Sequence, residues 1–336
     1  MISDARVKVS VCVPVYKAEK YIERCARSLF EQTMRDGIEF IFVDDGSPDN
    51  SLEIVRRVLA DYPHREHQVS FIRHETNRGR VAARWSGIRV AKGDFITHCD
   101  SDDSVDPELY ERMYGLAESE GLDAVVSPIR EIWMTGREII HDDESQTLDE
   151  YIGSRLASNA FNSLANKLIS RRAYGRICDG GDVGLSYGED LLLVSQLLME
   201  CRNIGFVHDR YYNYYRNPES GTVACEDDIA HARQWVQVAK SLGDALSQRY
   251  PNALDYLRHD GCIKMLRTLQ CPEDEFNALW PESRTWKSLA ADTRLAFYKK
   301  LLILCCSRYY AIGFLIVRLL LRTQKLYRKM RNGART

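Results

Sequence analysis

The feature that most constrains the fold is a regular alternation of apolar, β-branched runs with amphipathic stretches through the first 130 residues. The pattern predicts strands at 7–15, 39–43, 69–74, 94–99 and 124–129, with helices between them at 18–32, 52–59, 79–91 and 107–119. Asp106 is expected to cap the last helix, with Pro107 at its first position. Apolar strands alternating with helices predict an α/β fold whose central sheet is mostly parallel and has helices on both faces. In such sheets ligands bind at the carboxyl ends of the strands.

Beyond residue 130 the alternation fades, and this change suggests how the chain is divided. A polar stretch at 135–149 is followed by an irregular region up to about residue 184. Helical periodicity returns at 189–199, and residues 228–270 predict one or two helices. We therefore expect a first domain over 1–225 with halves 1–130 and 131–225, a helical region over 226–293, and a distinct segment over 294–336.

The net charge of −2 conceals an asymmetry in charge along the chain. Residues 294–336 contain 11 Lys and Arg and no acidic residue, so all 48 Asp and Glu belong to the rest of the chain. An acidic body does not suit a nucleic-acid-binding protein. The amino terminus lacks a secretory apolar stretch, and no cysteine pair has C-x-x-C spacing. We therefore expect a cytoplasmic protein whose cysteines are reduced and mostly buried, without zinc.

Acidic residues gather where two of the expected strands end. Asp44 and Asp45 close the second strand, and Asp100, Asp102 and Asp103 follow the fourth. Carboxylates at one edge of a sheet repel one another, and a hard divalent cation bridging to a substrate diphosphate would relieve that repulsion. Solvated turns are the alternative, because Asp, Ser and Gly are common turn residues.

The familiar phosphate-binding loops are missing from this sequence. There is no glycine before Gly37, so no G-x-G-x-x-G fingerprint follows the first strand, and no Gly-Lys pair exists for a P-loop. Five segments nevertheless form an ordered set: VSVCVPVYKAEKYIERCARSLFEQT, FIFVDDGSPDNS, NRGRVAARWSGIRVAKGDFITHCDSDD, NKLISRRAYGR and YGEDLLLV. In order and approximate spacing, over about residues 7–220, they resemble glycosyltransferase family 2. The resemblance implies a GT-A fold and an inverting enzyme that uses a nucleotide sugar.

The resemblance also implies roles for the residues that would hold the donor. Pro14 and Tyr16 would line the uracil pocket, and Asp45 would bond the base. Asn77 and Arg84 would help to hold the nucleotide, with Arg84 reaching toward the phosphates. Lys17 departs from the family, which commonly has Asn at the corresponding position.

The same resemblance assigns the reacting groups. Asp100 would face ribose or sugar, and Asp102 would bind a Mn²⁺ or Mg²⁺ that clamps the diphosphate, with Asp103 in support. Asp190 would be the catalytic base that takes the proton of the acceptor hydroxyl. Glu189 would support it. A purely structural alternative is that Glu189 and Asp190 only cap the helix that they open.

Four further features are candidate parts of the site, and two of them have an alternative structural interpretation. Asp44 and Lys167 are candidate supporting residues, with Lys167 near the acceptor or a phosphate. His208 either completes the metal site or is a partly exposed structural histidine. The aromatic run YYNYYRN at 211–217 either contacts the acceptor or packs against the sheet.

The segment at 295–330 is both apolar and basic. Its longest uncharged run, 309–317, is nine residues, far short of the roughly 20 that a membrane-spanning helix needs. On a helix, one face would carry Arg318, Arg322, Lys325 and Lys329, and an adjacent stripe Leu319, Leu326 and Met330. This pattern predicts an amphipathic helix on an anionic membrane surface. Packing of the helix against the acidic body through the same charges is the alternative.

The sequence thus predicts a metal-assisted inverting hexosyl- or N-acetylhexosaminyltransferase. The donor is expected to be a UDP-sugar, and the acceptor a lipid-linked glycan or oligosaccharide in cell-surface polysaccharide or exopolysaccharide synthesis. The protein is expected at the inner face of the cell membrane as a peripheral protein. Two alternatives stay open: a sugar-phosphate nucleotidyltransferase, which expects a glycine- and arginine-rich loop that PVYKAEKY lacks, and a non-catalytic nucleotide-sugar-binding protein tethered at membranes.

Overall fold

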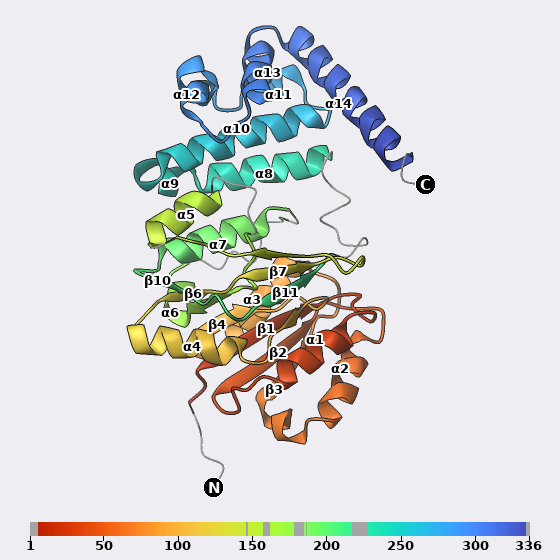
Figure 1. The fold of residues 1–336 in the computed structure, drawn as a ribbon, viewed down its shortest axis with the longest axis vertical. Helices are drawn as coiled ribbons and strands as arrows, with labels where there is room; N and C mark the ends of the chain where they lie inside the picture. Colours follow the sequence, from red (N-terminus) through yellow and green to blue (C-terminus); the bar gives the residue numbers. More distant parts are fainter. Residues whose placement is uncertain are drawn as a thin grey trace. The chain divides into compact units, whose positions relative to one another are not determined.

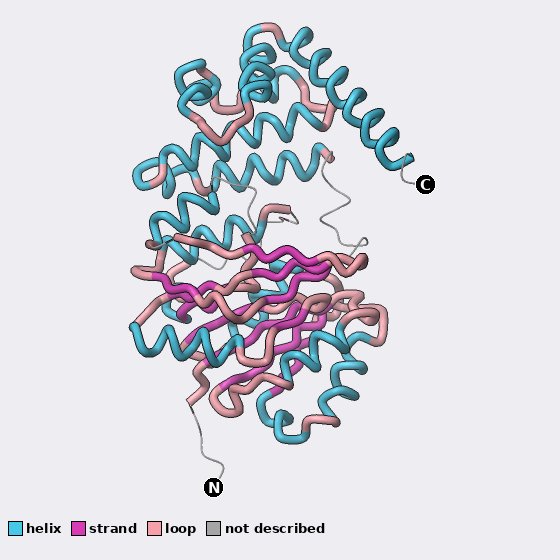
Figure 2. The backbone as a smooth tube through the Cα atoms, in the orientation of Figure 1, coloured by secondary structure: helices cyan, strands magenta, loops and turns pink. Residues whose placement is uncertain are grey.

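The computed structural model describes residues 6–145, 147–156, 162–177, 185, 187–216 and 228–333, with side chains up to residue 323. The chain forms two compact units, one from the described residues of 1–152 and 162–220, and the other from those of 153–161 and 221–336. The described strands lie in the first unit, and the second is helical (Figure 2).

A seven-stranded sheet is the centre of the first unit, in the order β10-β6-β9-β4-β1-β2-β3. Its strands are β1 (Val9–Val15), β2 (Ile38–Asp44), β3 (Val69–Arg73), β4 (Phe95–His98), β6 (Ala124–Val126), β9 (Lys167–Ser170) and β10 (Ile204–Phe206). Only β9 is antiparallel to its neighbours in this sheet as described, so β2, β4, β6 and β10 all end at one edge. Every residue of β1 is buried, as its central position requires. The prediction of a mostly parallel sheet with flanking helices is confirmed.

The flanking helices follow from the periodicity of the sequence. In α1 the buried positions Ile22, Cys25, Ala26 and Leu29 repeat at helical spacing and face the core. Figure 1 shows α1 and α2 together beside β2 and β3, and α3 contacts β1 and β2. The helices of this part of the chain are α1 (Ile22–Phe30), α2 (Ser51–Ala60), α3 (Arg80–Val90), α4 (Leu109–Glu120), α5 (Leu148–Leu156), α6 (Arg171–Tyr174) and α7 (Glu189–Met199), with a 3₁₀ helix at Pro63–Gln68.

A second, smaller sheet was not expected from the sequence. Its four strands, in the order β5-β11-β7-β8, are β5 (Ser104–Val105), β11 (Tyr212–Tyr215), β7 (Ile129–Ile132) and β8 (Glu138–His141). The strand predicted at 124–129 therefore divides between two sheets, with Ser127 and Pro128 at the break. Pro128 has no N–H to donate, so the ladder of β6 cannot continue through it.

One helix boundary was also wrong. The helix α4 begins at Leu109 with Glu108 as its N-cap, so Pro107 is not its first residue. Asp106 instead accepts the backbone N–H of Tyr211 on Oδ2, at 3.1 Å, and thereby ties the α4 entry to β11. A bond across the fold has replaced the local cap, which spacing along the sequence does not reveal.

The second unit is built from helices only. Residues 228–270 form three helices rather than one or two: α8 (Ile229–Ser241), α9 (Gly243–Arg249) and α10 (Pro251–Arg267). They are followed by α11 (Glu273–Asn277), a 3₁₀ helix at Pro281–Arg284, α12 (Trp286–Ala291), α13 (Phe297–Arg308) and α14 (Tyr310–Gly333). The helix α10 contacts α8, α13 and α14, and α13 packs on α14 (Figure 1). His259 of α10 is buried and bonds Asp292 and the carbonyl of Ser283 at 2.8 and 2.7 Å, which joins α10 to the α12 region.

Candidate active site at the carboxyl edge of the sheet

Both acidic strand ends lie at the same edge of the seven-stranded sheet. The strand β1 separates β2 from β4, with Asp44 beside Val15 and His98 beside Cys12. Asp100 follows β4 by two residues. Because β9 is antiparallel to β4, its first residue, Lys167, also lies at this edge. The topology therefore gathers the predicted acidic residues and Lys167 where a parallel sheet binds its ligand.

At the end of β2, the carboxylate of Asp45 is already held by the chain. Its Oδ1 accepts hydrogen bonds from His74 Nδ1 at 2.7 Å and from the Arg78 backbone N–H at 2.9 Å. Its Oδ2 accepts the backbone N–H of Gly79 at 2.8 Å. Asp45 is buried, and these bonds fix the loop that leads into α3. A contact of Asp45 with the uracil base stays a prediction.

The neighbouring turn is also fixed by backbone contacts. Asp44 accepts the Ser47 N–H at 2.8 Å on Oδ1, and its Oδ2 lies 3.2 Å from Arg73 Nε. Gly46 has φ of +69°, and a Cβ there would lie 2.8 Å from the backbone carbon of Thr76. Only glycine accepts both this conformation and this approach. The end of β2 is therefore packed directly against the loop that carries Asn77.

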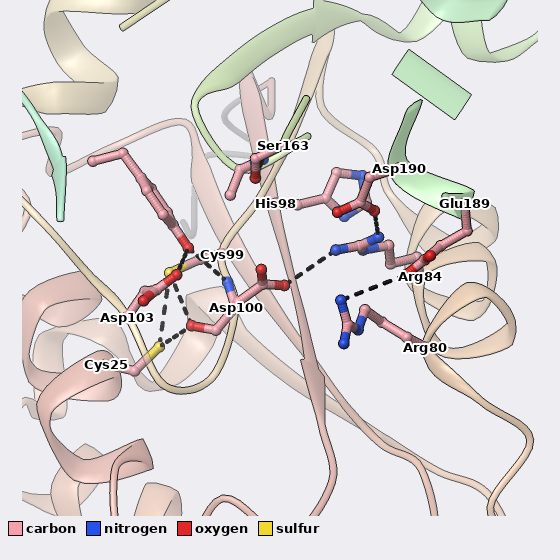
Figure 3. Close-up of polar contacts among 12 residues, drawn as sticks. Cys25, Arg80, Arg84, His98, Cys99, Asp100, Asp103, Ser163, Glu189 and Asp190 are labelled. Atoms are coloured by element: carbon pink, nitrogen blue, oxygen red, sulfur yellow. Dashed lines mark hydrogen bonds and ion pairs between the residues drawn. The ribbon is translucent and has the colours of Figure 1, made fainter. Parts of the chain in front are cut away.

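At the end of β4, an arginine links two motifs that are far apart in the sequence. Arg84 of α3 is 1% exposed. Its Nη2 lies 3.2 Å from Asp100 Oδ1, and its Nη1 donates to Asp190 Oδ1 (Figure 3). One turn earlier on the same helix, Arg80 Nη1 lies 3.4 Å from Glu189 Oε1. The helix α3 thus brings the acidic end of β4 together with the first turn of α7.

Opposite charges determine how this cluster ionises. Burial alone would lower the pKa of Arg84, but Asp190, Asp100 and Glu189 raise it well above the usual value. Burial acts to raise the pKa of Asp100, and Arg84 and Arg80 more than offset this, so the pKa of Asp100 is lowered. Arg84 and Asp100 therefore form a charged pair at neutral pH.

The next two carboxyl groups are shifted in the opposite direction. Burial and the charge of Asp100 raise the pKa of Asp102, and burial with the charges of Asp102 and Asp100 raises that of Asp103 well above its usual value. Asp103 accepts the Tyr212 hydroxyl at 2.6 Å and the Tyr215 N–H at 2.9 Å. It therefore packs beneath the strand end as a supporting group.

The donor set at the end of β4 fits a hard cation that shares its coordination with a substrate. In the part of the chain that the structure describes, no three His, Cys, Asp or Glu side chains are arranged to hold a metal. The Asp102 carboxyl group is, however, largely buried and close to the charge of Asp100, and both effects raise its pKa. A Mg²⁺-like ion needs only one or two carboxylates when substrate phosphates and water complete its shell. Asp102 meets that requirement.

The residues predicted to line the nucleotide pocket make fewer side-chain contacts with one another than the acidic residues at the end of β4 do. Pro14 is buried in β1, whereas Tyr16 and Asn77 are exposed at the same edge of the sheet. Lys17 has φ of +52°, in the left-handed region, and its ammonium lies 5.2 Å from the Tyr16 ring centre. Asn enters this region more readily than Lys, so the departure at Lys17 carries some backbone strain.

Two candidate residues have other surroundings. His208 bonds Asp142 Oδ2 at 2.9 Å and stacks on Phe206. It follows β10, which β6 and β9 separate from β4, and three strand spacings amount to roughly 14 Å. The contacts of His208 are thus with Asp142 and Phe206, and a role of His208 in a metal site stays a prediction. Lys167 is buried, and its Nζ donates to the Ser163 carbonyl at 2.6 Å.

Two residues of this cluster, Arg80 and Arg24, were not identified from the sequence, whereas Tyr212 belongs to the aromatic run noted there. Arg80 lies four residues before Arg84, and that helical spacing was the available signal. Arg24 of α1 donates to the backbone carbonyl of Asp102, and its guanidinium lies 3.4 Å from the Tyr215 ring centre. Tyr212 accepts the Asp100 N–H at 3.1 Å. The run at 211–217, as far as residue 216, therefore packs beneath the end of β4.

The helix α7 has the predicted bounds. Its first two residues, Glu189 and Asp190, do not cap it. Gly188 is the N-cap, with φ of +77°, and no side chain makes a capping bond there. The side chains of Glu189 and Asp190 instead point to Arg80 and Arg84 (Figure 3). The purely structural interpretation of this pair is therefore not what the contacts show.

This combination of sheet, acidic strand ends and helical flank is that of a GT-A fold. The family model for glycosyl transferase family 2 matches residues 10–178, half of the chain. The chain belongs to glycosyltransferase family 2.

Two curated relatives and two solved structures illustrate the similarity. Glycosyltransferase GlyG of Streptococcus pneumoniae is 28% identical over 256 residues, which cover 71% of this chain and 80% of that protein. Putative glycosyltransferase EpsH of Bacillus subtilis is 35% identical over 212 residues, 61% of this chain and 60% of that one. Staphylococcus aureus TarS 1–349 in complex with UDP-GlcNAc has a TM-score of 0.59 at 18% identity, covering 91% of this chain and 92% of that one. Mannosyltransferase PcManGT from Pyrobaculum calidifontis, in complex with GDP-Man and Mn²⁺, has a TM-score of 0.54 at 17% identity, covering 94% and 88%.

Among the residues described, none of the helices is both long enough and apolar enough to cross a bilayer.

Proposed function

We propose that this glycosyltransferase moves a hexosyl or N-acetylhexosaminyl group from a UDP-sugar to a hydroxyl of a glycan acceptor, with inversion at the anomeric carbon. The observation that carries the proposal is the pairing of Arg84 with both Asp100 and Asp190. It joins the acids that would hold the donor to the acid that would activate the acceptor. The UDP-GlcNAc complex of TarS supports the choice of donor class.

The donor would bind across the ends of β1, β2 and β4. The exposed ring of Tyr16 would be available to the base, and the buried Pro14 would line the pocket beside it. Arg84 and Arg80 supply positive charge where a diphosphate would lie, which stabilises the negative charge that develops on the leaving group. A diphosphate would also compete with Asp190 for Arg84, and this exchange would free the Asp190 carboxylate when the donor is bound.

Asp190 would then act as general base. A positioned carboxylate that takes the acceptor proton in the transition state typically contributes ~10²–10⁴-fold to the rate. A single base on the face opposite the leaving group gives one displacement and therefore inversion. Glu189 is held by Arg80 and supports the first turn of α7.

A divalent cation would be held by Asp102. When bound, Mn²⁺ or Mg²⁺ supplies charge neutralisation for the diphosphate. The neighbouring charge of Asp100, which contributes to the raised pKa of Asp102, would be offset by a bound cation. The Mn²⁺ in the PcManGT complex is consistent with this choice.

The acceptor is proposed to be a lipid-linked glycan used in cell-surface polysaccharide or exopolysaccharide synthesis. The basic segment at 294–336 supports this proposal, because its charges would attract an anionic membrane surface. It places the enzyme at the inner face of the membrane as a peripheral protein.

The first experiment is calorimetric titration of the purified chain with UDP, with and without Mn²⁺. Binding is expected to require the metal and to be lost in Asp102→Ala. Asp142→Ala is the matched control, because Asp142 is a partly exposed acid bonded to His208 rather than to this cluster. Equal binding by the two variants would contradict the assignment of Asp102. If UDP, GDP and dTDP all fail to bind, the proposed donor class is wrong.

A further inference from the structure

The first two turns of α14, residues 310–317, carry no charged side chain on any side, although only one side of the helix is covered. On the inner side, Val317 is buried and Gly313 packs against α13, where an added Cβ would lie 2.5 Å from Cys306 Sγ. On the outer side, the apolar residues remain in solvent, with Leu315 56% exposed. These outer residues repeat at helical spacing, at Ile312, Leu315, Ile316, Leu319 and Leu320. A helix that is apolar all round normally has both sides covered.

Apolar side chains are also exposed on α13 and at its junction with α14. We group them with the outer face of α14 as the α13–α14 surface, which consists of Phe297, Tyr298, Leu301, Tyr309, Ile312, Leu315, Ile316, Leu319 and Leu320. Tyr298 of α13 and Leu320 of α14 line one groove together with Ile263 and Leu266 of α10, so the two helices meet at this surface. Exposed apolar side chains gathered on neighbouring helices are typical of interaction sites.

The charges around this surface indicate the chemistry of its partner. Residues 294–336 contain 11 basic residues and no acidic one. Arg318 and Arg322 are exposed, and on the helix they lie beside Leu315 and Leu319, at the flank of the outer face. Apolar side chains bordered by cations match an acyl boundary bordered by phosphates.

We propose that the α13–α14 surface inserts into the headgroup region of an anionic bilayer, with the two helices lying along the membrane. A second copy of the chain would cover the apolar side chains but would supply no phosphate to the bordering arginines, unless its own acidic residues reached them, whereas an anionic bilayer satisfies both. The proposal concerns residues outside the active site and does not depend on which donor the enzyme uses.

The test is sedimentation of the full-length chain with vesicles of phosphatidylcholine and phosphatidylglycerol, compared with vesicles of phosphatidylcholine alone. Binding is expected to be stronger with the anionic vesicles. The combined variant Ile312→Gln, Leu315→Gln and Leu319→Gln should weaken it by about tenfold or more. Arg318→Gln with Arg322→Gln should remove the preference for anionic lipid. Met134→Gln is the matched control, because Met134 is an 85% exposed apolar residue of the first unit.

A second measurement protects the test against a variant that simply misfolds. Leu315→Trp adds a fluorophore to the outer face, and its emission should shift to shorter wavelength with anionic vesicles but not with neutral ones. The proposal is overturned if the wild-type chain does not bind anionic vesicles, or if the glutamine variants bind them as well as the wild type. It is also overturned if the lipid-free chain is a dimer that the triple variant dissociates, since a second copy would then cover the surface.

Discussion

The ends of β2 and β4 have similar sequences but different surroundings. Both carry neighbouring Asp residues at the same edge of the sheet. At the end of β2, Asp45 receives three hydrogen bonds from its own chain, two of them from backbone N–H groups. At the end of β4, Asp100 shares the side chain of Arg84 with Asp190, and the pKa of Asp102 is raised by burial and by Asp100.

The comparison teaches that acidic residues at a strand end can serve two different purposes. Carboxylates whose oxygens are filled by backbone donors order a loop, because those bonds exist without a ligand. Carboxylates paired with arginine side chains instead of backbone donors can exchange those partners for a charged substrate. We therefore expect substitutions near β4 to affect chemistry and substitutions near β2 to affect stability.

The largest effect is expected from Asp190→Asn. The amide cannot accept the proton of the acceptor, so kcat should fall by ~10²–10⁴-fold. Donor binding should persist, because Arg84 and Asp100 remain. Transfer is measured with UDP-sugar and acceptor, beside titration with UDP. Glu200→Gln, at the other end of α7, is the control and should leave transfer unchanged. Full turnover by Asp190→Asn would sink the assignment of the base.

Asp45→Asn should have the second largest effect, on stability. The side-chain amide cannot accept at both positions, so a buried donor, such as the Gly79 N–H that bonds Oδ2, loses its partner. An unpaired buried donor costs about 2 kcal/mol. Denaturation by urea should show this loss, whereas a variant as stable as the wild type would contradict the structural role of the β2 end.

Asp123→Asn tests a carboxylate that is held by arginines at the opposite edge of the sheet, just before β6. Burial acts to raise the pKa of Asp123, but bonds from Arg202 and Arg172 more than offset it, so the pKa lies below its usual value of 3.8. The stability that this shift contributes is therefore present above about pH 4 and is lost as the pH falls through the lowered pKa. Since Arg202 is largely exposed and screened, we expect about 1 kcal/mol at pH 7.

The measurement is the difference in unfolding free energy between wild type and Asp123→Asn from pH 7 down to pH 3. The difference should shrink in acid, where the carboxyl group is protonated in both the folded and the unfolded chain. A difference that stays constant with pH would show that the ion pairs with Arg172 and Arg202 are not its source.

Asp102→Asn should change stability least. The pKa of Asp102 is raised by burial and by the charge of Asp100, so its ionised form is not favoured by the fold. Removing that charge should leave the unfolding free energy unchanged or slightly higher, while metal-dependent UDP binding is lost. A large loss of stability in this variant would remove the contrast between the two strand ends.

Much of the first unit could be predicted from the sequence because its elements are locally encoded. The strands β1 to β4 and the helices α1 to α3 lie within a few residues of their predicted bounds, and α7 has the predicted bounds. The grouping of Asp44 with Asp100 at one edge also followed, since parallel strands end at the same edge. The start of α4 at Leu109 did not follow, because a hydrogen bond to the backbone of Tyr211, next to β11, replaces the local cap. The break at Pro128 was missed although the missing N–H of proline was a signal for it.

The sequence by itself determined the order of strands and helices, the positions of the acidic residues at the strand ends, and the basic character of the last helices. Tertiary structure alone decided which acids are held by backbone donors, that Arg84 joins Asp100 to Asp190, and that the outer face of α14 stays uncovered. The physical reason is distance along the chain. Arg84 and Asp190 are 106 residues apart, and spacing in the sequence carries no information about a contact that long-range packing creates.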